Sequence, residues 1–257
     1  MKIQVLIATM NQTDHSLLER MNIKSDAIVG NQCERNEIED FEFKNNNIKW
    51  LSFNEKGVGL NRNNALMRAE GDICLIADDD MIYYDNYCDI IVQAFNRHPD
   101  ADIIIFNLKE KNPSRYVIPK DSKVNRFNYL RYGTARIAFK LKSIKLNGIY
   151  FNQCFGGGTK YCHGEDNLFL TSCLNKGLKI YAVPEYIAEL TEERESTWNS
   201  GYDENYLSDQ GALYKAVSKK WWRFLCLQDA LRRHRSYKMQ WYKAYKIMKQ
   251  GAKNYFK

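Results

Sequence analysis

Residues 71–84 constrain the fold more than any other stretch of the chain. An apolar run from Ile73 to Ala77 has the length and β-branched content of a buried strand, and three consecutive carboxylates, Asp78, Asp79 and Asp80, end it. In an open α/β sheet, ligands bind beyond the carboxyl ends of the strands. The stretch therefore predicts a sheet that carries an acidic cluster facing a crevice.

Three neighbouring acids indicate a bound cation, because clustered carboxylates raise one another's pKa unless a positive charge lies among them. Oxygen ligands suit a hard divalent ion such as Mg²⁺ or Mn²⁺, and substrate phosphates usually complete the shell of such an ion. The alternative is an acidic turn that caps the next helix, since Asp is a common N-cap.

The first 106 residues alternate between expected strands and helices with short links, which is the pattern of a parallel sheet with helices on both faces. Strands are predicted at residues 2–9, 26–30, 48–53, 73–77 and 103–106. Helices are predicted at residues 17–21, about 60–69 and 85–96. The later part is less regular, with a strand at 135–140, a helix at 164–176 and a strand at 178–183 that Pro184 should stop.

The net charge of +7 is concentrated at the C-terminal end of the sequence. Residues 219–257 contain twelve Lys and Arg against one acid, Asp229, whereas the preceding residues are mildly acidic. Trp221, Trp222, Trp241 and Tyr245 lie among these cations, as in helices that bind anionic lipid at a membrane surface. One alternative is that these aromatic residues pack on the rest of the protein. Another is a tail that binds nucleic acid, with an affinity that falls steeply with salt.

The sequence also bears on location. The N-terminal residues become polar too early for a signal peptide, and no apolar run approaches the roughly 18 residues that a membrane span requires. The seven cysteines lack a CxxC pair or metal-ligand spacing, which indicates reduced thiols. We expect a cytoplasmic protein, and association with the inner face of the plasma membrane is left open.

Three further groups are candidates for binding or catalysis, and each has a plain structural alternative. Thr9 and Asn31 follow early strands and could hydrogen-bond a base or ribose, or simply form turns. Arg62 follows a glycine-containing loop and could neutralise phosphate, or be a solvated cation. Glu165 and Asp166 begin a helix after a glycine-rich loop and could complement its dipole.

The order of these pieces resembles glycosyltransferase family 2, the inverting nucleotide-sugar transferases of GT-A fold. The segments that carry the resemblance are residues 5–11, 57–66, 69–81 and 164–166, within about residues 1–215. Residues 195–198 and 201–206 also look like bacterial members that build surface polysaccharides such as capsules.

The resemblance implies an α/β, Rossmann-like GT-A fold with a mixed, mostly parallel sheet flanked by helices. Residues 1–215 would form the catalytic domain, with a nucleotide-binding half at 1–106 and an acceptor-binding half at 107–215. Residues 216–257 would form a basic, aromatic, helical tail.

The resemblance also implies roles for particular residues. Asp166 is the expected general base, with Glu165 beside it, and Asp80 and Asp78 are the expected ligands of Mn²⁺ or Mg²⁺. The residues expected at the nucleotide donor are Thr9, Met10, Asn11, Asn31, Arg62, Asp78 and Asp79. The residues expected at the acceptor are Gly157, Gly158, His163 and Trp198.

We therefore expect a metal-dependent, inverting hexosyltransferase that uses a UDP-linked donor. Its acceptor would be a growing bacterial glycan, and a lipid-linked oligosaccharide is one form of it. An anionic membrane surface is the expected partner of residues 219–257, and no nucleic acid is expected. In this chemistry a cation offsets the charge on the leaving diphosphate while a separate carboxylate takes the acceptor proton.

Two departures from the family pattern stand out. Many relatives carry a His after the last strand as a further metal ligand, and this chain offers only Glu189, Glu192 or water there. An acid is usual after the second strand, where this chain has Asn31 and Gln32.

A phosphatase with an Asp nucleophile is a competing hypothesis, although Thr9, Met10 and Asn11 stand where its paired acids are usually found.

Overall fold

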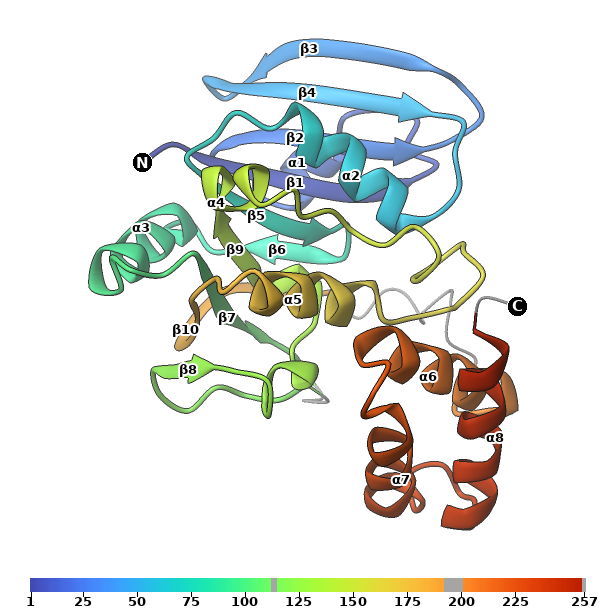
Figure 1. Ribbon diagram of the computed structural model, residues 1–257. Coiled ribbons are helices and arrows are strands. Elements are labelled where there is room, and N and C mark those ends of the chain that lie inside the picture. The colour runs from blue at the N-terminus through green and yellow to red at the C-terminus, as the bar shows by residue number, and fades with distance from the viewer. Residues whose placement is uncertain (112–114, 192–200, 256–257) are drawn as a thin grey trace.

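A ten-stranded mixed sheet forms the centre of the protein (Figure 1). The computed structural model describes residues 1–111, 115–191 and 201–255. The strands are β1 (Ile3–Met10), β2 (Asp26–Gln32), β3 (Glu37–Phe43), β4 (Asn46–Phe53), β5 (Ile73–Asp78), β6 (Met81–Tyr83), β7 (Ile103–Lys109), β8 (Ser122–Val124), β9 (Ile137–Lys140) and β10 (Ile180–Leu190). They are hydrogen-bonded in the order β3-β4-β2-β1-β5-β9-β7-β10-β6, and β8 pairs with β10.

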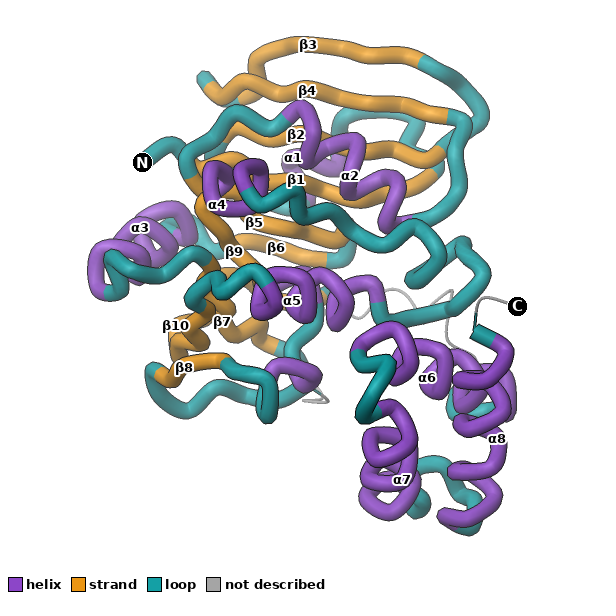
Figure 2. Tube along the Cα trace, viewed as in Figure 1, coloured by secondary structure: helices purple, strands orange, loops and turns teal. Residues whose placement is uncertain are grey.

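Helices cover both faces of this sheet (Figure 2). They are α1 (Leu17–Arg20), α2 (Val58–Arg68), α3 (Tyr87–Arg97), α4 (Leu141–Leu146) and α5 (Glu165–Asn175), with short 3₁₀ turns η1 (Tyr129–Arg131) and η2 (Thr134–Arg136). Val5 and Ile7 of β1 share one core with α1 and α3, whereas Leu6 shares the other with α2, α4 and α5. Successive side chains of a strand point to opposite faces, so a strand buried on both faces reads as a continuous apolar run. The expected sheet flanked by helices is confirmed.

The carboxyl ends of the central strands meet at one edge of the sheet. Strand β1 pairs in parallel with β2 on one side and with β5 on the other. In this register Thr9 lies opposite Asn31, and Ala8 lies opposite Asp78. The acidic cluster after β5 therefore lies beside the end of β1, as the sequence predicts.

The sheet differs from the sequence prediction at β3, at β10 and at β6, whose residues 81–83 are not predicted as a strand. Strand β3 is not predicted, because an edge strand can carry charges and its side chains are mostly polar. Strand β10 does not stop at Pro184 but continues to Leu190. Its register against β7 shifts between Ala182 and Tyr186, and such an irregularity accommodates a proline that cannot donate a ladder hydrogen bond.

The remaining helices, α6 (Glu204–Val217), α7 (Trp222–Arg233) and α8 (Trp241–Asn254), form a helical unit beside the sheet (Figure 1). Helices α6 and α8 cross very closely. A Cβ atom added to Gly211 would lie 1.9 Å from the carbonyl oxygen of Met248, and one added to Gly251 would lie 2.0 Å from that of Ser208. The crossing therefore requires glycine at both positions.

The aromatic residues of the tail divide between packing and exposure. Trp222 is buried in the helical unit with Met248, and Tyr245 packs partly against them. Trp221 and Phe224, in contrast, are 59% and 58% exposed. Trp222 and Tyr245 thus fit the interpretation that the aromatic residues pack within the protein, whereas Trp221 and Phe224 are exposed as a lipid-binding surface requires. Among the helices that the structure describes, none has both the length and the apolar character needed to cross a membrane.

Candidate functional site

A cavity of about 1030 Å³ opens where the carboxyl ends of β1 and β5 face the start of α5. Its volume is at the top of the range of roughly 300–1,000 Å³ for small-molecule sites, so it has room for more than a single sugar. The predicted residues that line it are Thr9, Met10, Arg62, Asp78, Asp79, Asp80, Gly157, His163, Glu165 and Asp166.

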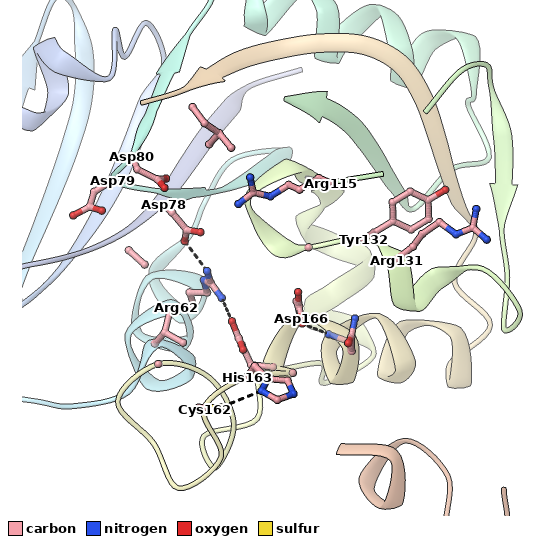
Figure 3. A pocket seen from close by; sticks show the side chains of 18 of the residues that line it. Arg62, Asp78, Asp79, Asp80, Arg115, Arg131, Tyr132, Cys162, His163 and Asp166 are labelled. Atoms are coloured by element: carbon pink, nitrogen blue, oxygen red, sulfur yellow. Dashed lines mark hydrogen bonds and ion pairs between the residues drawn. The ribbon is translucent and has the colours of Figure 1, made fainter. Parts of the chain in front are cut away.

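Arg62 of α2 joins the acids of β5 to those of α5 (Figure 3). Its Nη2 donates to Asp78 Oδ1 at 2.6 Å, and its Nη1 donates to Glu165 Oε1 at 2.8 Å. The side chain is only 4% exposed, and the two carboxylates raise its pKa against the effect of burial. Arg62 is therefore a permanently charged link between the two acidic parts of the cavity.

Asp166 has the properties of a general base. Its Oδ1 accepts a hydrogen bond of 2.6 Å from the backbone N–H of Asn167. Burial, followed by the negative charge of Glu165, raises its pKa to about 7. A base with a pKa near the operating pH combines a high ionised fraction with strong affinity for the proton.

Glu165 is enclosed rather than available for proton transfer. Its side chain is 13% exposed and pairs with Arg62, and a Cβ atom on Gly156 would lie 2.7 Å from its Oε2. Gly156 also has a φ of 99°, which disfavours any other residue there. Glu165 is therefore held between Arg62 and the backbone of Gly156.

The three consecutive aspartates have different surroundings. Asp78 pairs with Arg62, and Asp79 accepts a hydrogen bond of 2.6 Å from the Thr9 hydroxyl. Burial, followed by the charge of Asp78, raises the pKa of Asp80 to about 6. The backbone carbonyl of Asp80 accepts hydrogen bonds from the N–H and the hydroxyl of Thr191, at the end of β10. This link is not predicted from the sequence, since the two residues lie 111 positions apart.

The surroundings of Asp80 suit a divalent cation, because a nearby positive charge would relieve both the burial and the like charge. Within the described part of the chain, no group of three or more His, Cys, Asp and Glu side chains is arranged to hold a metal ion. Glu189 pairs with Lys109 at 2.7 Å and does not line the cavity, and Glu192 lies outside the described residues.

Asn31 does not reach the cavity, which corrects the role expected for it. It is fully buried and hydrogen-bonds the backbone of Gln12, whereas its neighbour Gln32 lines the cavity. The Asn31 amide is instead held by hydrogen bonds with the backbone of Gln12 and the hydroxyl of Ser52. Asn11, in the turn after β1, and Gly158 are likewise not part of the lining, and Trp198 lies outside the described residues.

The helical unit supplies a wall of the cavity that is not predicted from the sequence. Tyr206, Gln210, Tyr214 and Arg233 line it together with His163. The His163 ring stacks on Tyr206 at 4.3 Å, and its Nε2 lies 2.9 Å from Gln210 Oε1. Burial lowers the pKa of His163, which favours the neutral ring. Helix α6 therefore belongs to the site as well as to the helical unit.

The chain was compared with protein-family models, with curated proteins and with solved structures. Residues 15–156 match the sequence model of the family described as Glycosyl transferase family 2. Among solved structures, the chain is similar to S. aureus TarS 1–349 in complex with UDP-GlcNAc, with a TM-score of 0.65 and 15% identity over 99% of this chain and 92% of that one. The complex of TarS 1–349 with UDP gives a TM-score of 0.62 and 18% identity over 91% and 72% of the two chains.

S. aureus TarS without a stated fragment gives a TM-score of 0.63 and 15% identity over 97% of this chain and 55% of that one. No curated protein matches the sequence. At these identities the likeness speaks for the fold alone, and it confirms the expected GT-A class.

Proposed function

The chain belongs to glycosyl transferase family 2 and is a glycosyltransferase, and we propose that it transfers a sugar with inversion from a UDP-linked donor to a hydroxyl of a bacterial glycan. The observation that carries the proposal is the position of Asp166. This carboxylate, with a pKa of about 7, lines the same cavity as Asp78, Asp79 and Asp80 but stands apart from them (Figure 3).

The donor belongs at the carboxyl ends of β1 and β5. Thr9, Met10 and Gln32 line the cavity there, next to the three aspartates. TarS, which shares the fold, is described in complexes with UDP-GlcNAc and with UDP, and this supports a UDP-linked donor for the present chain. Ligands of open α/β sheets bind at this edge in general.

Asp166 acts on the acceptor. It takes the proton of the acceptor hydroxyl as that oxygen forms its bond to the anomeric carbon, while the bond from this carbon to the diphosphate oxygen breaks. The electron pair of the broken bond leaves with the diphosphate. Asp166 stands apart from the aspartates after β5, and this supports an approach of the hydroxyl on the face opposite the leaving group, which would invert the anomeric centre.

The other acids position these groups. Asp80 and Asp78 would hold Mn²⁺ or Mg²⁺, which when bound supplies positive charge to offset that on the diphosphate. Arg62 fixes Asp78 and Glu165 through its two ion pairs, so the two acidic parts of the cavity keep their spacing. Glu165 in turn contributes to the raised pKa of Asp166.

We propose in addition that the acceptor is met at an anionic membrane surface, such as the inner face of the plasma membrane. Trp221 and Phe224 are exposed at the start of α7, next to Lys219, Lys220 and Arg223. Exposed aromatic residues among cations are suited to the headgroup region of anionic lipid. A lipid-linked glycan would then be concentrated at the surface where the enzyme binds.

Transfer from UDP-sugars to a glycan, measured together with UDP binding by calorimetry, tests the proposal. Asp166→Asn should lower transfer by about 10²–10⁴-fold and leave UDP affinity unchanged. Asp89→Asn, an exposed acid of α3 outside the cavity, is the matched control and should transfer normally. Retained transfer in Asp166→Asn would reject the base. GDP- and dTDP-sugars serve as comparison donors in thermal unfolding of the protein. If either of them raised the unfolding temperature more than the UDP-sugars do, a UDP-linked donor would be rejected.

A further inference from the structure

A second cavity, of about 470 Å³, lies beside the first and is lined largely by residues that the proposed transfer reaction does not use. Glu110 and Arg115 line both cavities, so the two are neighbours. The other side chains on its walls are those of Tyr84, Asn107, Leu108, Lys109, Tyr116, Val117, Arg136 and Tyr186.

Arg136 is the unusual member of this wall. It is 2% exposed, and its Nη1 donates to the carbonyl oxygen of Tyr116 at 2.9 Å. Its Nε and Nη2 are buried and have no hydrogen-bond partner among the described residues. Burial lowers its pKa to about 10, so the guanidinium still carries its charge at neutral pH. A buried cation with two unsatisfied donors is costly unless an anion meets it.

Among the residues that the structure describes, no acid forms an ion pair with Arg136. The acid whose charge acts on Arg136 is Glu110, but the Glu110 carboxylate pairs with Arg115 at 2.5 Å. Arg115 also faces the second cavity and opposes the charge on Arg136. This end of the cavity therefore presents two guanidinium groups against one carboxylate.

Aromatic rings surround these cations. The Arg136 guanidinium lies 5.2 Å from the centre of the Tyr132 ring, and that of Arg131 lies 4.6 Å from the centre of Tyr116. Arg131 and Tyr132 line the first cavity (Figure 3), and Tyr116 and Arg136 line the second, so this group of rings and cations contacts both cavities. Apolar ring faces beside a few fixed polar groups are typical of small-molecule sites.

We propose that the second cavity binds an anionic group, a phosphate or a carboxylate, that the acceptor glycan carries near its reacting hydroxyl. The inference rests on the proposed transfer function and adds the charge of its acceptor. A guanidinium fork binds such a group through paired, charge-assisted hydrogen bonds, and Nε with Nη2 of Arg136 form such a pair of donors. The tyrosines would pack against the adjoining sugar ring.

Calorimetry with glucose 6-phosphate, glucuronate and glucose, each added to the full chain with saturating UDP, tests the inference. Saturation with UDP keeps the phosphate probe out of the donor position. Glucose 6-phosphate or glucuronate should bind roughly ten-fold or more tightly than glucose, and the stronger of the two identifies the anionic group. Equal affinities for the three probes would overturn the inference.

Two sets of variants locate the binding. Arg136→Gln should remove the preference for the charged probes and leave UDP affinity unchanged. Val117 is 47% exposed on the same cavity, so Val117→Glu should fold, compete for Arg136 and weaken binding of the charged probe roughly ten-fold. Val117→Gln is its uncharged match and should keep that binding. If Arg136→Gln does not fold, the Val117 pair decides, and equal binding by its two members overturns the inference.

Failure of this inference and failure of the proposed function give different results. Absence of UDP binding in the wild type would reject the donor but would leave the comparison of Val117→Glu with Val117→Gln intact. UDP binding without discrimination among the three probes would reject only the anionic subsite.

Discussion

Arg62 and Glu165 form a buried ion pair of 2.8 Å between α2 and the first turn of α5, although 103 positions separate them in the sequence. The same guanidinium holds Asp78, at the end of β5. Burial is the main cause of the raised pKa of Asp166; Glu165 and Asp78 raise this pKa further, and Arg62 lowers it. The charges that hold the cavity together therefore also tune the protonation of the proposed base.

Replacement of Glu165 should shift the pH dependence of transfer. In the wild type, the acidic limb of kcat/KM should lie near pH 7, because Asp166 must lose its proton before it can accept another. Glu165→Gln removes a like charge, so the pKa of Asp166 should fall and the limb should move to lower pH by about one unit. A pH–rate profile of both proteins measures this shift. A limb that stays in place would show that Glu165 does not tune Asp166.

Asp166→Asn should stabilise the protein at high pH while it abolishes transfer. The folded pKa of Asp166, about 7, lies above the unfolded value of about 3.9, so the wild type loses stability as pH rises from about 4 to 7, and the loss is complete above pH 7. Asn cannot ionise. The variant should therefore exceed the wild type by up to about 4 kcal/mol in free energy of unfolding at pH 8.

Urea unfolding at pH 8 and at pH 3.5 measures this difference, with the wild type as the reference at each pH. Below the unfolded pKa both side chains are neutral, and the two proteins should converge. A variant that is less stable than the wild type at pH 8 would contradict the raised pKa.

The acidic cluster should bind Mn²⁺ with a measurable gain in stability. Thermal unfolding of the wild type with Mn²⁺ and UDP should occur at higher temperature than with UDP alone, because the ion binds only the folded state. Asp80→Asn should lose most of this gain, and Asp40→Asn, an exposed acid on β3, should retain it. Equal gains in Asp80→Asn and the wild type would exclude Asp80 as a ligand, and full transfer activity in a chelator would exclude the metal.

The sequence predicts those parts of the fold and site that depend on local pattern. The apolar run of β5 ends in Asp78, and the glycine-rich loop precedes Glu165 and Asp166, so both acidic groups are visible in the sequence. The choice between Asn31 and Gln32 is not, because it depends on contacts made outside β2: the Asn31 amide is held by Gln12 and Ser52, whereas Gln32 lines the cavity.

Long-range packing accounts for the other differences. Tyr206 and Gln210 enter the cavity only because α6 packs beside α5 and His163, which no local pattern reveals. The charge on Arg136 is visible in the sequence, but only the structure shows that Glu110 pairs with Arg115 and that Arg136 has no acidic partner in the described part of the chain.

The crossing of α6 and α8 should not tolerate a methyl group. Gly251→Ala would gain about 1 kcal/mol in an exposed helix, but here the new Cβ atom would lie 2.0 Å from the carbonyl oxygen of Ser208. Overpacking should dominate and destabilise the protein by about 1–3 kcal/mol. Chemical denaturation measures the effect, and Lys246→Ala, exposed on the same helix, is the control. A variant as stable as this control would show that the helices can move apart without loss.

Trp221 and Phe224 should govern binding to anionic membranes. Both side chains are more than half exposed, and Lys219, Lys220 and Arg223 surround them, so burial of the rings and attraction of the cations act on the same lipid surface. Sedimentation with vesicles of phosphatidylcholine, with and without phosphatidylglycerol, should show binding only to the anionic vesicles. A double variant that carries Trp221→Ser and Phe224→Ser should bind these vesicles roughly ten-fold or more weakly.

The control is Ile38→Ser, which alters an apolar residue that is 50% exposed among the acids of β3. This variant should bind like the wild type. Equal sedimentation of the double variant and the wild type would instead favour a tail whose cations are merely solvated.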